Sequence, residues 1–292
     1  MTLSIVTLSY NTLDLILECV GSLQKLYKAE LENKIVEIIV VDNASKTATV
    51  EGVEKELGGL PGVKLIKSQE NLGFGRGCNL GAENAKGDFV LFLNSDTKTS
   101  DRGFLEMTEF LKSNPKVGVL GGKLKNFDGS PQASVGKFYN LFNFFVMLFG
   151  LEKFGFLRSS PGDVCKVDWV SGACMMVNKS IFEKIGGFDK IFFMYIEDME
   201  LCYRAKKQNY LTYYYPKVSV FHKEQGSSNR TFAVVNIYKG LLYFYKIHKS
   251  RLEYNIVKVS LKTKALGVYL LGKITNNSYY ISTYGQALEI FK

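Results

Sequence analysis

The sequence has few features of a disulfide-stabilised or membrane-spanning protein. Its five cysteines include no Cys-x-x-Cys pair, and the odd number argues against a disulfide framework and favours a reducing cytoplasm. The N-terminus has no basic segment followed by an apolar one, so we expect no signal peptide. The most apolar aromatic stretch, residues 138–151, has 14 residues, too few to span a bilayer. We therefore expect this stretch to be a membrane-interface segment, an acceptor-side flap or a buried core helix.

The common phosphate-binding motifs are also missing. Residues 71–79 (Asn-Leu-Gly-Phe-Gly-Arg-Gly-Cys-Asn) contain three close glycines, but their spacing matches neither G-x-G-x-x-G nor a Walker loop. Close glycines still let backbone amides approach a phosphate at a helix N-terminus, and Arg76 adds a positive charge. A plain tight turn explains the glycines equally well.

Positive charge is concentrated near the C-terminus. The formal net charge is +9, and residues 206–292 carry 14 Lys and Arg against 3 Asp and Glu. Residues 1–205 are therefore slightly acidic, with a net charge of −2. A basic, aromatic-rich tail suits an anionic membrane surface or a polyanion. A solvated basic face that keeps the protein soluble is the alternative.

Strand and helix patterns alternate along the first 120 residues. We expect strands at 3–9, 35–41, 63–66, 89–93 and 117–120, and helices at 13–23, 74–85 and 103–111, the first capped by Asn11 or Thr12. Further strands at 175–177 and 211–220 and a helix at 197–208 follow, and residues from 232 onward read as helical. The alternation predicts an α/β domain with a mostly parallel sheet flanked by helices.

Acidic residues follow the ends of two of these strands. Asp42 follows the strand at 35–41, and Asp96 follows the strand at 89–93 in the sequence Asn-Ser-Asp-Thr. Ligands of open α/β sheets bind at the carboxyl ends of the strands. There, an Asp can accept hydrogen bonds from a base or ribose, or bind a divalent metal beside a diphosphate. A helix cap or an Asx turn is the alternative for each.

Three later residues are also candidates for chemistry. Glu197 and Asp198 open a predicted helix, where the helix dipole stabilises carboxylates, and either could act as a general base toward a hydroxyl. His222 stands at a strand end, where a neutral imidazole can bind a metal; a purely structural histidine is the alternative.

Taken in order, these motifs resemble those of the family 2 inverting glycosyltransferases, which have the GT-A fold. The likeness is greatest to the rhamnosyltransferase and galactofuranosyltransferase-like branch. It covers residues 3–228 and rests on residues 9–11, 41–45, 71–75, 94–96, 187–189, 197–198 and 222. The resemblance implies a GT-A domain over residues 1–228 and a basic helical extension over residues 229–292.

The resemblance also implies a role for individual residues. Asp96 and His222 would bind a divalent metal, Mg²⁺ or Mn²⁺; Asp198 would be the catalytic base, and Trp169 and Glu197 would lie on the acceptor side. The family's metal-binding D-x-D triad reads Asn-Ser-Asp here, so its first carboxylate is missing. The residues that would contact the nucleotide-sugar are Thr7, Tyr10, Asp42, Gly73, Arg76, Asn79, Asn94 and Ser95.

The implied activity is transfer of a hexose, rhamnose-like or other, in cell-surface polysaccharide synthesis. The donor would be a UDP- or dTDP-linked sugar and the acceptor a hydroxyl of a glycan or lipid-linked glycan, with inversion at the anomeric carbon. We expect a cytoplasmic protein, with peripheral attachment to the inner face of the cell membrane and homo-oligomerisation left open. No nucleic-acid partner is expected, because residues 1–205 are slightly acidic.

Other functions stay open. A related nucleotidyltransferase would carry an N-terminal glycine-rich and basic loop, which residues 3–13 lack. A polymerising synthase would have several membrane spans and a Q-x-x-R-W segment, and neither is present. A catalytically impaired nucleotide-sugar-binding protein is the remaining alternative.

Overall fold

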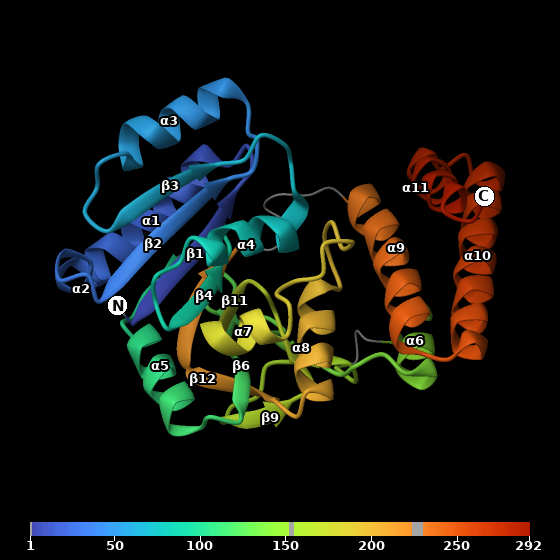
Figure 1. The fold of residues 1–292 in the computed structure, drawn as a ribbon. Helices are drawn as coiled ribbons and strands as arrows, with labels where there is room; N and C mark the ends of the chain where they lie inside the picture. Colours follow the sequence, from blue (N-terminus) through green and yellow to red (C-terminus); the bar gives the residue numbers. More distant parts are fainter. Residues whose placement is uncertain (1, 152–154, 224–229) are drawn as a thin grey trace. The chain divides into compact units, whose positions relative to one another are not determined.

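The computed structural model describes residues 2–151, 155–223 and 230–292 (Figure 1). The chain divides into two units. The sheet unit comprises residues 1–138, 158–191 and 198–227, and the helical unit comprises residues 139–157, 192–197 and 228–292. The domain boundary predicted at residue 228 falls outside the described residues.

A mixed sheet forms the centre of the sheet unit. Its strands are β1 (Leu3–Ser9), β2 (Val36–Asp42), β3 (Val63–Lys67), β4 (Phe89–Leu93), β5 (Thr97–Thr99), β6 (Val117–Lys125), β9 (Cys165–Val167), β11 (Cys174–Asn178) and β12 (Leu211–His222). They run in the order β3-β2-β1-β4-β11-β6-β12-β5, and β9 pairs with β12. The four strands from β3 to β4 are mutually parallel, as are β6 and β12. β11, β5 and β9 pair antiparallel with their neighbours. A second sheet contains β7 (Val135–Gly136), β8 (Arg158–Ser159) and β10 (Trp169–Val170).

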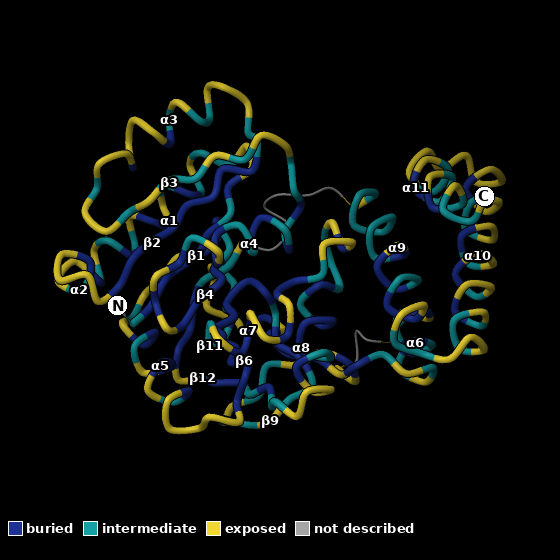
Figure 2. Tube along the Cα trace, viewed as in Figure 1, coloured by how far each residue is buried: buried dark blue, intermediate teal, exposed yellow. Residues whose placement is uncertain are grey.

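Helices cover both faces of the parallel strands. In the sheet unit they are α1 (Leu13–Leu26), α2 (Lys28–Glu32), α3 (Thr47–Leu57), α4 (Gly73–Glu83), α5 (Phe104–Ser113), α7 (Lys179–Lys184) and α8 (Glu197–Lys207). Successive side chains of β1 point to opposite faces, as a strand requires. Leu3 and Ile5 join Ile16 of α1 in one buried core, whereas Val6 and Leu8 lie beneath α4. The strands are therefore buried on both sides (Figure 2).

The glycine-rich segment forms the first turns of the helix predicted at 74–85, so the alternative of a plain tight turn is wrong. Gly73, with φ of +73°, stands at the start of α4. A Cβ on Gly77 would lie 2.5 Å from a methyl group of Leu8, and one on Gly81 would lie 2.3 Å from Val6. These two glycines therefore let α4 approach the sheet closely, which explains them without a ligand.

The helical unit contains α6 (Leu141–Leu148), α9 (Arg230–His248), α10 (Arg251–Ile274) and α11 (Ser278–Glu289). Phe144 of α6 packs edge-on against Tyr245 of α9, and both side chains are fully buried. Lys264 of α10 donates a hydrogen bond to the carbonyl oxygen of Leu148. Among the described residues, none of the helices combines the length and apolarity needed to cross a bilayer.

The stretch at 138–151 contains the predicted helix, and only part of it is core. It contains a helix, α6, whose Phe144 is buried, so part of it is core. Phe142 and Phe149 are 75% and 72% exposed, so its other side is open.

Candidate functional site

Polar side chains gather where β1, β2 and β4 end. Ser9, the last residue of β1, pairs in register with Asp42, the last of β2. The Thr12 hydroxyl lies 3.3 Å from that of Ser9 and 3.5 Å from that of Ser95, just beyond β4. Thr12 occupies the predicted N-cap position of α1, but its side chain makes no cap hydrogen bond, and Asn11 accepts one from the backbone amide of Lys46. Thr12 therefore links two strand ends at the site.

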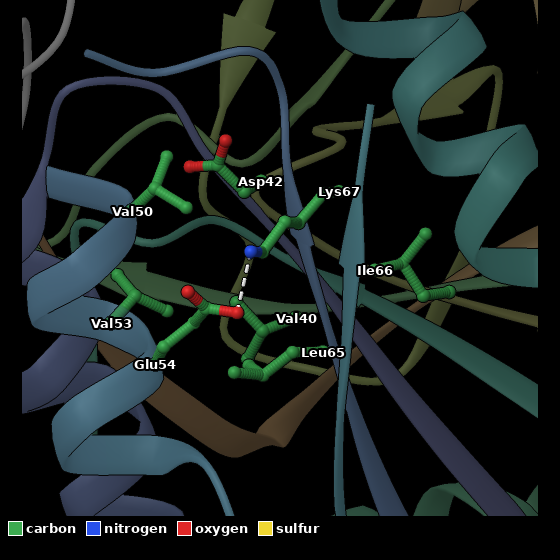
Figure 3. Close-up of a pocket in the computed structure, with 8 residues that line it drawn as sticks. All are labelled: Val40, Asp42, Val50, Val53, Glu54, Leu65, Ile66 and Lys67. Atoms are coloured by element: carbon green, nitrogen blue, oxygen red, sulfur yellow. Dashed lines mark ion pairs between the residues drawn. The ribbon is translucent and has the colours of Figure 1, made fainter. Parts of the chain in front are cut away.

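Asp42 is buried and partly unsatisfied. Its Oδ1 accepts a hydrogen bond from the Ser45 amide, an Asx-type contact. Its Oδ2 is also buried, yet among the described residues nothing donates to it. A small pocket beside it is lined by Val40, Asp42, Val50, Val53, Glu54, Leu65, Ile66 and Lys67 (Figure 3). An unsatisfied buried carboxylate oxygen is costly, so Asp42 is suited to accept a hydrogen bond from a ligand.

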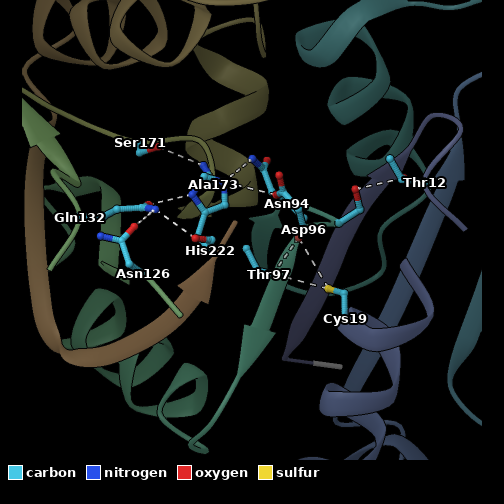
Figure 4. Close-up of polar contacts among 11 residues, drawn as sticks. Thr12, Cys19, Asn94, Asp96, Thr97, Asn126, Gln132, Ser171, Ala173 and His222 are labelled. Atoms are coloured by element: carbon cyan, nitrogen blue, oxygen red, sulfur yellow. Dashed lines mark hydrogen bonds and ion pairs between the residues drawn. The ribbon is translucent and has the colours of Figure 1, made fainter. Parts of the chain in front are cut away.

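Asp96 faces His222 across a short gap. The two meet because β12 pairs with β5, which puts His222 opposite Thr97. Oδ1 of Asp96 lies 3.3 Å from Nε2 of His222, and within the described part of the chain no hydrogen bond reaches this oxygen (Figure 4). The side chains are 7% and 14% exposed. A carboxylate oxygen and an imidazole nitrogen at this spacing fit a divalent cation.

These two side chains are the protein's own contribution to such a cation site. Across residues 2–151, 155–223 and 230–292, no group of three His, Cys, Asp or Glu side chains forms a metal cluster. A cation bound here would take its other ligands from a bound molecule or from water, as Mg²⁺ does when it bridges a protein and phosphates.

Asp198 is connected to the same edge of the sheet. Its Oδ2 accepts a hydrogen bond from the Gly172 amide at 3.2 Å, and its Oδ1 accepts one from the Met199 amide at 2.7 Å. The backbone carbonyl of Ala173, the next residue after Gly172, accepts a hydrogen bond from the backbone amide of Asn94. The short turn at residues 171–173 thus joins Asp198 to the segment that carries Asp96.

The surroundings of Asp198 favour its protonated form. Burial raises the pKa of its carboxyl group, and the hydrogen bonds from Gly172 and Met199 oppose that rise without cancelling it. A carboxylate with a raised pKa is a stronger proton acceptor than an ordinary surface aspartate.

The backbone just before Asp198 is strained. Tyr195 and Ile196 both have positive φ, 71° and 73°, in a segment without glycine. This conformation costs roughly 1–2 kcal/mol per residue. Phe192 packs against Tyr243 of α9, which helps to hold the segment. Strain of this kind is common at functional sites, and the sequence contains no residue that signals it.

Other predicted site residues are engaged with the protein itself. The Asn79 amide donates to the Phe188 carbonyl and accepts from the Phe188 amide, so it fastens α4 to the turn at 187–188. Arg76 forms an ion pair with Glu70 at 2.6 Å near the surface. The Trp169 indole donates to the Lys137 carbonyl at 3.1 Å and is 7% exposed.

The remaining predicted residues differ in how accessible they are. Thr7 is 1% exposed within β1, and Glu197 is 5% exposed at the start of α8. Tyr10, just after β1, is 45% exposed. Tyr10 is therefore open to a ligand in the present structure, whereas Thr7 is enclosed by the protein.

Sequence reasoning missed several residues of this region. Gln132 hydrogen-bonds to the ring of His222 from 90 positions away. Arg204 forms an ion pair with Glu200 and donates to the carbonyls of Ile185 and Gly187, which ties α8 to the preceding turn. The i,i+4 spacing of Glu200 and Arg204 was a detectable signal for their pairing, but nothing local in the sequence marks Gln132.

Comparisons with known proteins identify the family of the chain. The pattern of the family described as "Glycosyl transferase family 2" matches residues 4–186. The N-acetylglucosaminyl-diphospho-decaprenol L-rhamnosyltransferase of Mycobacterium tuberculosis is 27% identical over 215 residues, 67% of this chain and 69% of that protein. The rhamnosyltransferase WbbL of Escherichia coli is 28% identical over 172 residues, 55% of this chain and 64% of that protein.

Solved structures confirm the predicted GT-A fold. The mannosyltransferase PcManGT from Pyrobaculum calidifontis, solved with GDP-Man and Mn²⁺, superposes with a TM-score of 0.57 at 17% identity, over 99% of this chain and 74% of that one. GalNAc-T7, solved with UDP, GalNAc and Mn²⁺, has a TM-score of 0.60 at 17% identity, over 84% of this chain and 50% of that one. At this identity the likeness concerns the fold alone.

Proposed function

The chain belongs to glycosyl transferase family 2, and from this we propose that it transfers a rhamnose-like hexose from a UDP- or dTDP-linked donor to a lipid-linked glycan, with inversion. A glycosyltransferase of cell-surface glycan synthesis is what the family and its relatives establish. The mycobacterial relative is named as an L-rhamnosyltransferase that acts on a lipid-linked diphospho-sugar. This name motivates both the donor sugar and the acceptor class proposed here.

One observation carries the proposal. The turn at 171–173 hydrogen-bonds both to the Asp198 carboxylate and to the backbone amide of Asn94, two residues before Asp96. A proton acceptor and a candidate cation site are thereby linked by a few residues. Direct displacement at an anomeric carbon needs these two functions on opposite sides of the sugar.

On the donor side, Asp42 would accept a hydrogen bond from the nucleoside through its unsatisfied Oδ2. Asp96 and His222 would hold a divalent cation, which when bound offsets negative charge on the departing diphosphate. Arg76 would add a positive charge beside the phosphates once it leaves Glu70.

On the acceptor side, Asp198 would take the proton from the attacking hydroxyl. Its carboxylate is held by two backbone amides, so it needs little rearrangement to meet an acceptor. The hydroxyl oxygen forms a bond to the anomeric carbon as the bond to the diphosphate breaks, so the configuration inverts and no covalent enzyme intermediate forms.

The helical unit supports peripheral membrane attachment. One face of α10 exposes Leu252, Val259, Leu266, Leu270 and Ile274 at intervals of seven or four residues, which we call the α10 stripe. Exposed lysines flank it at positions 258, 262 and 273. An apolar helix face bordered by lysines is typical of helices that lie in the surface of an anionic bilayer.

Replacement of the base tests the proposed chemistry. Asp198→Asn is expected to lower turnover of a nucleotide-sugar roughly 100- to 10,000-fold, because it removes the base but keeps the shape of the side chain. The matched control is Asp163→Asn, at an exposed aspartate elsewhere in the sheet unit. Turnover by the Asp198→Asn protein equal to that of the control would contradict the assignment.

The pH dependence of the unmodified protein gives a second readout. The base works only when deprotonated, and burial raises the pKa of Asp198. Turnover should therefore decline with falling pH at a higher pH than an ordinary aspartate would produce. If turnover instead declines only near the ordinary pKa of aspartate, a buried Asp198 is not the base.

A further inference from the structure

A continuous series of hydrogen bonds runs from the surface to the His222 ring. The exposed carboxylate of Asp128 accepts from the Ser130 hydroxyl at 2.6 Å, and the Ser130 oxygen accepts from Nδ2 of Asn126 at 2.8 Å. Oδ1 of Asn126 accepts from Nε2 of Gln132 at 2.7 Å. Oε1 of Gln132 lies 2.8 Å from Nδ1 of His222. Every link lies within the sheet unit.

The orientation of the Gln132 amide is fixed from two directions. Its nitrogen lies 3.0 Å from the backbone carbonyl oxygen of His222, which can only accept. The same nitrogen also donates to Oδ1 of Asn126. The Asp128 carboxylate can only accept, so the Ser130 hydroxyl donates to it and must itself accept from Nδ2 of Asn126. The orientation of the Asn126 amide is therefore fixed as well. A flipped Gln132 amide would place its oxygen against a carbonyl oxygen. Oε1 of Gln132 must therefore face the imidazole.

This orientation determines which ring nitrogen of His222 carries the proton. Because Oε1 of Gln132 accepts, Nδ1 of His222 must donate, and the neutral ring keeps its lone pair on Nε2. This Nε2 atom lies 3.3 Å from Oδ1 of Asp96. The side-chain nitrogen of Asn94, a weak donor, lies 3.4 Å from the same Nε2 atom. Two electron-rich atoms thus face each other, an arrangement that a cation would stabilise.

We propose that Gln132 is a positioning residue that locks His222 in the Nδ1–H tautomer, so that Nε2 is presented with Asp96 to a divalent cation. The inference deepens the proposed function and rests on it for the cation. Hydrogen bonds of this kind behind a ligating histidine set its tautomer and orientation, and their loss typically weakens metal binding 10- to 100-fold. Gln132 is itself buried, so water does not compete for the contact.

The tautomer can be read directly in the metal-free, full-length protein. The chain has two histidines, so ¹⁵N-histidine labelling gives two sets of ring signals, and a His248→Gln protein assigns them. At alkaline pH, long-range ¹H–¹⁵N correlation spectra should show His222 with its proton on Nδ1. A proton on Nε2 would overturn the proposal without any substitution in the site.

Two variants separate positioning from general structural support. Gln132→Met keeps the length of the side chain but removes the acceptor, and it should abolish the tautomer preference and weaken Mn²⁺ binding about 10- to 100-fold. Asn126→Ala removes one of the two constraints and keeps the His222 carbonyl, so the Nδ1–H tautomer should persist. Unchanged tautomer and Mn²⁺ affinity in Gln132→Met would contradict the proposal.

The same measurements distinguish this inference from the proposed function. If the unmodified protein transfers sugar while His222 carries its proton on Nε2, the inference alone is wrong. If His222 shows the Nδ1–H tautomer and Gln132→Met loses it, the positioning role stands, even if no nucleotide-sugar is turned over. Absence of Mn²⁺ binding to the unmodified protein in the presence of UDP would overturn the cation site in both the inference and the proposed function.

Discussion

The two units differ in which side chains have an unusual solvent exposure. In the sheet unit, Asp42 and Asp96 are buried, and each has a carboxylate oxygen to which no described residue donates. In the helical unit, large apolar side chains are exposed, including Phe142 at 75% and Ile274 at 82%. Both features cost free energy in water. In the sheet unit the unsatisfied oxygens lie at the candidate site, whereas the exposed apolar side chains of the helical unit include the α10 stripe, on which the proposed membrane attachment rests.

The largest effect on ligand binding is expected from removal of one buried carboxylate. Asp96→Asn should weaken Mn²⁺-dependent binding of a nucleotide-sugar about 100-fold, or about 2.7 kcal/mol, because the amide cannot offset the charge of a cation. Titration calorimetry with UDP- and dTDP-linked sugars, with and without Mn²⁺, measures this. Asp88→Asn, at the exposed aspartate just before β4, is the control. Equal affinity of the two variants would remove Asp96 from the cation site.

A smaller effect is expected when the exposed apolar surface of the helical unit is reduced. Val259→Ser combined with Leu266→Ser should weaken binding to anionic vesicles roughly tenfold, because two aliphatic side chains no longer enter the lipid surface. Cosedimentation at low and high salt measures the affinity. The control is Ile35→Ser with Ile191→Ser, two exposed aliphatic residues of the sheet unit. If both double variants lose binding equally, the α10 stripe has no special role.

The same comparison explains what the sequence could predict. Strands β1 and β4 begin and end at the predicted residues. The reason is plainest for β4, because a strand buried on both faces is a continuous apolar run followed by polar residues. That pattern also identified Asp42 and Asp96 as residues that follow strand ends. The family resemblance, rather than periodicity, linked them to His222 and Asp198.

Other features depend on contacts between distant segments. The antiparallel insertion of β11 between β4 and β6 follows from packing that no local motif encodes. Gln132 contacts His222 because β12, which ends in His222, pairs with β6, the strand that precedes Gln132 in the chain. Thr12 has the sequence context of a helix cap, yet its hydroxyl lies beside those of Ser9 and Ser95, and only the sheet brings the segment of Ser95 next to it.

The smallest expected effects come from two glycines, one in a helix of each unit. Gly81→Ala in α4 should lower the free energy of unfolding by about 1 kcal/mol, because the new methyl group would lie 2.3 Å from Val6 and the overpacking exceeds the gain in helix propensity. Gly267→Ala in α10 should raise it by about 0.5–1 kcal/mol, because nothing lies within 4 Å of the added Cβ. Urea unfolding of both variants measures the changes. Equal gains in stability would mean that α4 can move away from the sheet, and close packing would then not account for the glycines beside the site.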